Sequence, residues 1–291
     1  MFWMGIKMTG RQTGIRRRHI EQGMESSISS QNPNLTFSQL KELLFYDAYE
    51  SFYAMAEHSS AFRSYCKEAF GEDFSQDGFS DLQQIDLIMQ NVPLSSTSSI
   101  LDIGCGNGKM LGYLQQKSGA RISGFDYSVN AIQTARIQYP VHADFRIGII
   151  GEIQYPPEQF DLITSMDTMY FSQDMTAFVS QIKSWLKPDG ILFVGYQEGD
   201  VMPKTKNVHT AELTKALQAN HMPFRTMDIT RQTYELLLRK RQAAQHHEAA
   251  LEAEGYRAWF DLLISQTECA LLPYEQFEQK MTRYIYIAKR Q

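Results

Sequence analysis

The sequence of 291 residues is poor in cysteine, in long apolar runs and in basic charge. Its three cysteines, Cys66, Cys105 and Cys269, are far apart and odd in number, which fits neither a disulfide framework nor a zinc knuckle. We therefore expect a reducing compartment, and cytoplasmic localisation. No stretch approaches the roughly 18 apolar residues that span a membrane, and the first residues lack a hydrophobic signal core. No membrane association is expected.

Charge argues against a nucleic-acid substrate. The net charge is −5, and the one dense basic cluster, "GIRRRH", lies within the first thirty residues. The remainder of the chain is therefore more acidic than the whole, and it should repel a phosphate backbone. We expect no nucleic-acid partner, and the sequence indicates no oligomeric state.

Composition is that of an ordinary globular protein, with 43% hydrophobic and 21% charged residues, and the length suits one or two domains. Residues 1–35 are predicted to be a disordered tail, with an organelle transit peptide as the alternative. The other expected regions are an N-terminal helical cap (36–92), a ligand-binding core (93–230), a helical insertion that completes the cap (231–280) and the last strand of the core (281–291).

The first predicted helix, residues 36–55, is amphipathic and rich in aromatic side chains. Tyr46, Tyr49 and Tyr53 have spacings that place them on one face of this helix. That face either packs on the core or closes over a bound ligand. Further helices are expected at 60–70 and 81–90.

From residue 99 the sequence alternates short β-branched runs with helical segments. The predicted strands are 99–103, 120–126, 144–150, 160–166, 190–196, 224–230 and 282–289, and the helices between the first five are 108–118, 128–139 and 174–188. A further helix is expected at 210–220. This alternation predicts an α/β fold with a doubly wound, mostly parallel sheet. The last two strands can pair as neighbours, so the stretch between them is predicted to be an insertion that packs over the sheet, beside the N-terminal helices.

The stretch "ILDIGCGNGKML" places three glycines, Gly104, Gly106 and Gly108, between a strand and a helix. Glycine allows positive φ angles and an approach of ligand to backbone that a Cβ would block, and open α/β sheets bind ligands at this end of their strands. A dinucleotide site would require glycine at the position of Lys109. Asp126, which ends the second strand, can accept hydrogen bonds from ribose hydroxyls.

At these residues the chain resembles the class I S-adenosylmethionine-dependent methyltransferases, which have a Rossmann-like fold. The resemblance lies in "LDIGCGNGKML", "GFDYS", "FDLITSM" and "LKPDGILFV", which occur in the family's order between residues 99 and 196. It implies S-adenosyl-L-methionine as the cofactor. The implied cofactor-binding residues are Asp102, Gly104, Cys105, Gly106, Asn107, Gly108, Asp126, Tyr127, Ser128, Ile149, Ile150 and Met166, with Tyr46 from the first helix.

One position departs from the family pattern. The family commonly has aspartate where this chain has Ile149, and that carboxylate accepts from the adenine amino group. Its loss removes one polar anchor, worth about 0.5–1.5 kcal/mol. We expect Ile149 and the backbone of Ile150 to hold the ring by apolar contact.

The segment "SMDTMYFSQD" after the fourth strand is expected to face the transferable methyl group. It lacks the "NPPY" type of sequence that the family uses for base amines and glutamine amides. Asp167 and Tyr170 are the candidate catalytic residues, to orient the acceptor or line the methyl pocket. Asp167 capping the next helix is the alternative.

No metal site is expected, because the adjacent His246 and His247 should point in different directions on a helix. The prediction is a methyltransferase for a small organic acceptor, since inserted helices enclose a pocket whereas a polymer needs an open groove. The alternatives are an RNA or protein methyltransferase, favoured by the basic N-terminal cluster alone, and a non-catalytic cofactor-binding module.

Overall fold

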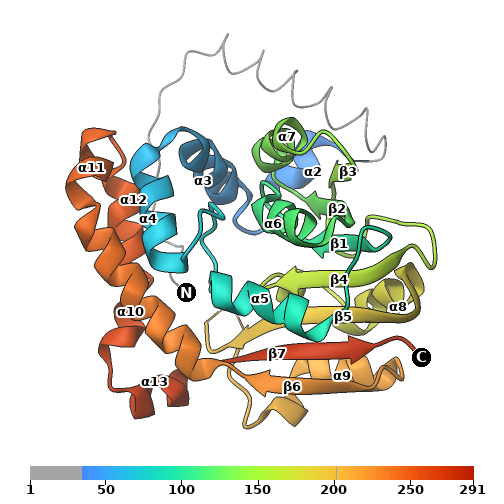
Figure 1. Cartoon of the computed structure of the whole chain (residues 1–291). Coiled ribbons are helices and arrows are strands. Elements are labelled where there is room, and N and C mark those ends of the chain that lie inside the picture. Colours follow the sequence, from blue (N-terminus) through green and yellow to red (C-terminus); the bar gives the residue numbers. More distant parts are fainter. Residues whose placement is uncertain (1–34, 201) are drawn as a thin grey trace.

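The computed structural model describes residues 35–200 and 202–291, so the expected tail lies almost wholly outside the described residues. A seven-stranded sheet forms the centre of the molecule, in the order β3-β2-β1-β4-β5-β7-β6 (Figure 1). The strands are β1 (Ser99–Ile103), β2 (Arg121–Asp126), β3 (Ala143–Ile147), β4 (Phe160–Met166), β5 (Leu186–Glu198), β6 (Phe224–Asp228) and β7 (Thr282–Lys289). The first five strands are parallel, and β7 pairs antiparallel with both β5 and β6. The predicted doubly wound, mostly parallel sheet is confirmed.

Helices cover both faces of the sheet because successive strand residues point to opposite sides. Ile100 packs with α5 (Leu82–Asn91), α6 (Lys109–Ser118) and α7 (Val129–Gln138). Leu101 packs on the other face with α8 (Met175–Trp185) and α9 (Glu212–Ala219). Strands buried on both faces explain the nearly continuous apolar runs of the sequence.

Two predicted boundaries in the core are wrong. The helix expected to reach Pro188 ends at Trp185, and β5 begins at Leu186 and includes Pro188. The pairing with β4 shifts register between Phe160 and Leu162, so the segment around Pro188 is irregular and tolerates a residue without an N–H group. The strand expected over 144–150 ends at Ile147.

The helix expected over 36–55 is two helices, α2 (Phe37–Lys41) and α3 (Tyr46–His58). Thr36 and Gln39 form a capping box at the N-terminus of α2, in agreement with the expected helix start at Thr36. Phe45 separates the helices with a φ of +64°. Its ring lies 6.4 Å from that of Phe171, and this contact with another part of the chain is not visible in the local pattern.

The helices of the insertion lie beside the N-terminal helices. It contains α10 (Thr230–His246), α11 (Glu248–Ala253), α12 (Arg257–Ser265) and α13 (Tyr274–Lys280), and α4 (Ser60–Phe70) lies alongside α10 (Figure 1). Phe52 of α3 packs against both Phe62 of α4 and Trp259 of α12, with ring centroids 5.4 and 5.8 Å apart. These helices form a layer beside the sheet with its own apolar cluster.

The helix α5 belongs to the sheet rather than to this layer. Its buried Ile85 and Ile88 lie in the same apolar cluster as Ile100 and Phe193 of the sheet. We therefore propose that the cap ends before α5 instead of at residue 92. Short 3₁₀ turns occur at Met169–Phe171, Val208–Thr210 and Glu268–Leu271. Among the described residues, no helix combines the length and apolar character needed to cross a membrane.

Candidate functional site

The glycine loop connects β1 to α6. Gly104, Gly106 and Gly108 have φ angles of +72°, +53° and +77°, which side-chain-bearing residues rarely adopt. The backbone N–H groups of Gly104 and Cys105 both donate to the carbonyl of Phe125 in β2. A Cβ on Gly106 would lie 2.3 Å from the Tyr53 hydroxyl, so Tyr53 of α3 approaches the bare backbone closely. The loop therefore presents backbone rather than side chains.

Asp126 lies beside this loop at the end of β2. Its Oδ2 accepts from the N–H of Gly106 at 3.0 Å, and its Oδ1 accepts from the N–H of Ser128 at 2.8 Å. Burial raises the pKa of Asp126 to about 6, although these N–H groups counteract the shift. Since a carboxylate has about four lone-pair directions, each oxygen keeps one for a ligand hydroxyl.

The side chain of Asp102 lies in the same site. Its side chain is buried, and its Oδ1 accepts from the Thr164 hydroxyl at 2.7 Å. Burial raises the pKa of Asp102 to about 7, and the charge of Asp126 adds to this shift. Near neutral pH this carboxyl is therefore poised between its two protonation states.

The helix α3 covers the loop with the tyrosine face predicted from the sequence. Tyr46 and Tyr49 lie 5.8 and 6.1 Å from the ring of Tyr127, and Tyr53 stacks on Tyr49. Glu50 anchors the helix, because its carboxylate accepts from the Ser128 hydroxyl and from the N–H of Asn130 at the start of α7. Burial raises the pKa of Glu50 to about 7.

A cavity of about 550 Å³ extends from the glycine loop to the helical layer. Eight of the predicted site residues line it: Asp102, Gly104, Cys105, Gly106, Asn107, Met166, Asp167 and Tyr170. Seven do not line it: Tyr46, Gly108, Asp126, Tyr127, Ser128, Ile149 and Ile150. Asp126 remains next to the cavity through its hydrogen bond to Gly106. Ile149 and Ile150 are half-buried and pack toward opposite faces of the sheet.

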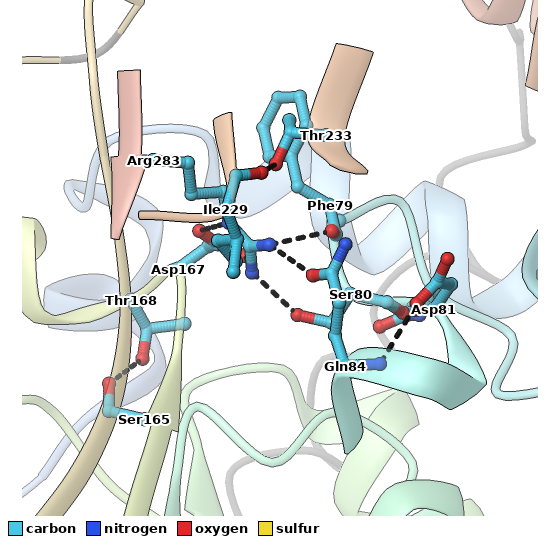
Figure 2. Close-up of polar contacts among 12 residues, drawn as sticks. Phe79, Ser80, Asp81, Gln84, Ser165, Asp167, Thr168, Ile229, Thr233 and Arg283 are labelled. Atoms are coloured by element: carbon cyan, nitrogen blue, oxygen red, sulfur yellow. Dashed lines mark hydrogen bonds and ion pairs between the residues drawn. The ribbon is translucent and has the colours of Figure 1, made fainter. Parts of the chain in front are cut away.

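The alternative role for Asp167, capping the next helix, is wrong. Its carboxylate accepts from Nε and Nη2 of Arg283 at 2.9 and 2.7 Å, and both side chains are buried (Figure 2). Arg283 also donates to the Phe79 carbonyl and the Ser80 hydroxyl, each at 2.8 Å. The following 3₁₀ turn has Thr168 at its N-cap, without a side-chain cap. Asp167 thus ties the end of β4 to β7 and to the loop before α5.

Tyr170, the other candidate catalytic residue, lies in the cavity wall. Its ring contacts those of Phe171 and Tyr196, at centroid distances of 5.0 and 6.0 Å. Burial raises the pKa of Tyr170 well above its ordinary value. The phenol is therefore neutral at physiological pH and can donate a hydrogen bond.

Several cavity residues were missed by the sequence analysis, among them Asp77, Lys240 and Gln266. They come from a loop and two helices far apart in the chain, and no local motif joins them. Of these three residues, only Lys240 could have been recognised as unusual from the sequence. It falls on the buried face of α10 with Leu236, Leu237 and Ala243, where a charged residue is unusual.

The argument that His246 and His247 point apart is also wrong. His246 Nδ1 and His247 Nε2 lie 2.8 and 3.0 Å from the same oxygen of Glu68, and the two rings stack. The helix α10 ends at His246, so the angular spacing of a helix no longer holds at His247. This cluster joins α10 to α4 at the surface.

Comparison with known proteins identifies relatives of this architecture. Residues 76–255, more than half of the chain, match the family described as a methyltransferase domain. Phosphoethanolamine N-methyltransferase 1 of Arabidopsis thaliana is 30% identical over 153 residues, which cover 51% of this chain and 30% of that protein. The ubiquinone biosynthesis O-methyltransferase of Xylella fastidiosa (strain 9a5c) is 33% identical over 115 residues, covering 38% of this chain and 46% of that protein. Each match spans less than half of the relative.

Solved structures share the fold at lower identity. Phosphoethanolamine N-methyltransferase 2 of Haemonchus contortus, in complex with phosphomonomethylethanolamine and S-adenosylhomocysteine, gives a TM-score of 0.67 at 17% identity and covers 84% of this chain and 60% of that one. The cyclase SpnF gives 0.57 at 20% identity, covering 72% and 80%. With the family match over residues 76–255 and the Rossmann-like sheet, the chain belongs to the class I S-adenosylmethionine-dependent methyltransferases.

Proposed function

We propose that this protein transfers a methyl group from S-adenosylmethionine to a small organic acceptor. The observation that carries the proposal is the single cavity that joins the glycine loop to the helical layer. A cavity of this volume next to a cofactor loop suits a small molecule, whereas a polymer needs an extended groove that is usually basic. The acidic net charge adds to the argument against an RNA substrate.

The residues present fit the cofactor. The bare backbone of Gly104 and Gly106 faces the cavity, and the Asp126 carboxylate keeps acceptor positions for two ribose hydroxyls. We infer that Tyr127 lies against the adenine with Ile149 and the backbone of Ile150. Asp102 is placed to receive the amino group of the methionine part.

A bound cofactor would supply an electrophilic methyl carbon for an acceptor lone pair, with sulfur keeping the electrons of the broken carbon–sulfur bond. The protein needs to align the acceptor and exclude water. Tyr49 and Tyr53 cover the loop, and the neutral phenol of Tyr170 is available to orient the acceptor. Asp167 is a positioning residue, because Arg283 engages both of its oxygens.

We also place the protein in the cytoplasm. The support is chemical: Cys66, Cys105 and Cys269 are all free thiols in the structure. Free buried thiols persist in a reducing compartment.

The test is calorimetry of the full chain with S-adenosylmethionine and S-adenosylhomocysteine. Asp126→Ala should weaken binding at least tenfold while the protein stays folded, because two ribose hydroxyls lose a charged acceptor worth roughly 1.5–3 kcal/mol per hydrogen bond. Asp189→Asn, at an exposed carboxylate near the start of β5, is the control and should bind as wild type.

Transfer itself is then measured with a methyl-labelled cofactor and candidate acceptors. Binding without transfer to any small acceptor would favour a non-catalytic module or another chemistry, which is a serious alternative because a cyclase shares this fold. Failure of both cofactor forms to bind would contradict the proposal at its first step.

A further inference from the structure

The cavity wall opposite the sheet contains a polar pair that the proposed function does not use. Asp77, in the loop before α5, and Gln266, which follows α12, both line the cavity. Gln266 Nε2 donates to Asp77 Oδ2 at 2.8 Å. The two side chains are thus held together, although 189 positions separate them in the sequence.

The second oxygen of each side chain has no donor. Asp77 Oδ1 and Gln266 Oε1 are buried, and among the described residues neither accepts a hydrogen bond. Buried acceptors are nearly always paired in native proteins, so a pair of them at a cavity wall indicates a missing donor. Because the two orphan oxygens belong to one hydrogen-bonded pair, a single ligand group can reach both.

The number of donors distinguishes the candidate groups. A hydroxyl has one O–H and satisfies one of the two oxygens, whereas a protonated primary or secondary amine has at least two N–H donors. Its positive charge also suits a carboxylate, since charge-assisted hydrogen bonds are the stronger kind. The aromatic rings of Phe79 and Tyr49, which also line the cavity, suit the apolar part of an amine.

Burial raises the pKa of Asp77 and the charge of Lys240 opposes this shift, so the lysine partly balances the carboxylate charge. Its ammonium group is buried, donates to the Gly78 carbonyl at 3.2 Å and lies 5.5 and 5.6 Å from the ring centroids of Phe70 and Phe79. Over the described ranges, no ion pair joins Lys240 to Asp77. The lysine makes this wall less negative, and its hydrogen bond goes to the Gly78 carbonyl rather than to the unpaired oxygens of Asp77 and Gln266.

The polar pair also lies near the predicted transfer centre. Burial raises the pKa of Tyr49, and the charges of Asp77 and Asp126 raise it further. Tyr49, Asp77 and Gln266 line the same cavity as Gly104 and Gly106 of the glycine loop.

We propose that the small acceptor carries a primary or secondary amine and that Asp77 and Gln266 bind it through their unpaired oxygens. This inference rests on the proposed methyltransferase function and names its substrate class. Recognition is assigned to Asp77 Oδ1 and Gln266 Oε1, with the amine donating one N–H to each.

The test is calorimetry of the full chain with three amines of increasing apolar size, ethanolamine, butylamine and 2-phenylethylamine. Each is compared with its hydroxyl counterpart, namely ethane-1,2-diol, butan-1-ol and 2-phenylethanol. At least one amine should bind tenfold more tightly than its alcohol. Asp77→Asn should remove that preference, and Gln266→Met should reduce it several-fold.

The control is Glu235→Gln, which changes an exposed acid to its amide on α10 and should keep the wild-type preference. Circular dichroism shows whether each variant folds. If Asp77→Asn does not fold, Gln266→Met decides the question. Equal binding of amines and alcohols by the wild type, or an amine preference that survives both substitutions, would overturn the proposal.

The same titrations are run with and without S-adenosylhomocysteine. Asp77→Asn should keep wild-type affinity for S-adenosylhomocysteine, because Asp77 does not contact the glycine loop in any recorded hydrogen bond of the described residues. If the wild type does not bind S-adenosylhomocysteine, the result counts against the methyltransferase function and not against the amine site. Amine binding measured without the cofactor still decides the amine site.

Discussion

At the residue scale, Asp126 has two tasks, and the proposed binding task depends on pH. Its oxygens hold the N–H groups of Gly106 and Ser128, and they are also the proposed acceptors for ribose. Burial raises the pKa of Asp126 to about 6, so the carboxyl is protonated below that pH and ionised above it. Only the ionised form offers the full charged acceptor to a hydroxyl.

Affinity for S-adenosylhomocysteine should therefore fall about tenfold between pH 7.5 and pH 5, as the ionised fraction of a group with this pKa falls by that factor. Asp126→Asn should bind more weakly at pH 7.5 and show a smaller change with pH, and the remaining change comes from Asp102, whose pKa burial raises to about 7. Calorimetry at five pH values between these limits checks both statements. A wild-type affinity that does not vary over this range would show that the Asp126 charge is not used in binding.

The buried pair of Asp167 and Arg283 has a structural cost that can be measured separately from catalysis. Arg283→Leu leaves the Asp167 carboxylate buried without its partner, and breaking a buried pair in this way typically costs about 3–5 kcal/mol. Urea unfolding should show this loss in the free energy of unfolding. The double variant Asp167→Asn with Arg283→Leu should recover part of it, because no unpaired charge then remains.

An exposed pair provides the comparison. Asp189→Asn breaks the contact of Asp189 with Lys289 at the surface and should change the free energy of unfolding by less than about 1 kcal/mol. If Arg283→Leu cost no more than this control, the Asp167 carboxyl would have to be neutral or solvated, contrary to its position in the structure.

At the element scale, the sequence predicted the core well because each strand and helix there carries its own periodicity. The succession of strands and helices along the chain, the glycine loop and Asp126 all followed from local pattern. The errors arose where a distant contact decides the conformation. Pro188 lies in a strand because β5 pairs with β4 and β7 across an irregularity, and Phe45 interrupts a helix next to Phe171.

The same distinction explains the candidate site. The residues of the glycine loop were predicted because one short motif contains them. Asp77, Lys240 and Gln266 belong to three elements, and only the packing of the insertion against α4 brings them to one cavity. Asp167 was predicted as a site residue but not as the partner of Arg283, because 116 positions separate the two. Spacing within one segment cannot reveal such a pair.

The helix α3 links the two parts of the molecule. On one side Tyr53 lies against Gly106 of the sheet domain, and on the other Phe52 packs with Phe62 and Trp259 of the helical layer. A ligand on the glycine loop is therefore expected to contact both parts, and the cap depends on α3 for its connection to the site.

At the scale of the whole molecule, the apolar cluster of the helical layer is distinct from the two that flank the sheet. It is assembled from helices at both ends of the described chain, and Glu50 connects it to α7 through polar contacts. Segments joined by fewer apolar contacts open at lower free energy than the core. We therefore expect the cap to unfold before the sheet when no ligand is bound.

Two tryptophans report on the two parts separately. Trp259 lies in the cap cluster, while Trp185 is buried beneath the sheet against Tyr155 and Phe178. Each is made the only tryptophan by replacing the other and Trp3 with phenylalanine, and urea unfolding is followed by fluorescence. Without ligand, the midpoint reported by Trp259 should lie at lower urea than that reported by Trp185.

Saturating S-adenosylhomocysteine should bring the two midpoints together. Ligand at about 100 times its Kd stabilises the state that binds it by about 2.7 kcal/mol, and that state includes α3 in contact with the loop. The cap therefore gains stability that the isolated layer lacks, and its transition shifts more than that of the sheet. Coincident midpoints in the absence of ligand would show that cap and sheet are one cooperative unit. A ligand that shifts Trp185 alone would show that α3 takes no part in binding.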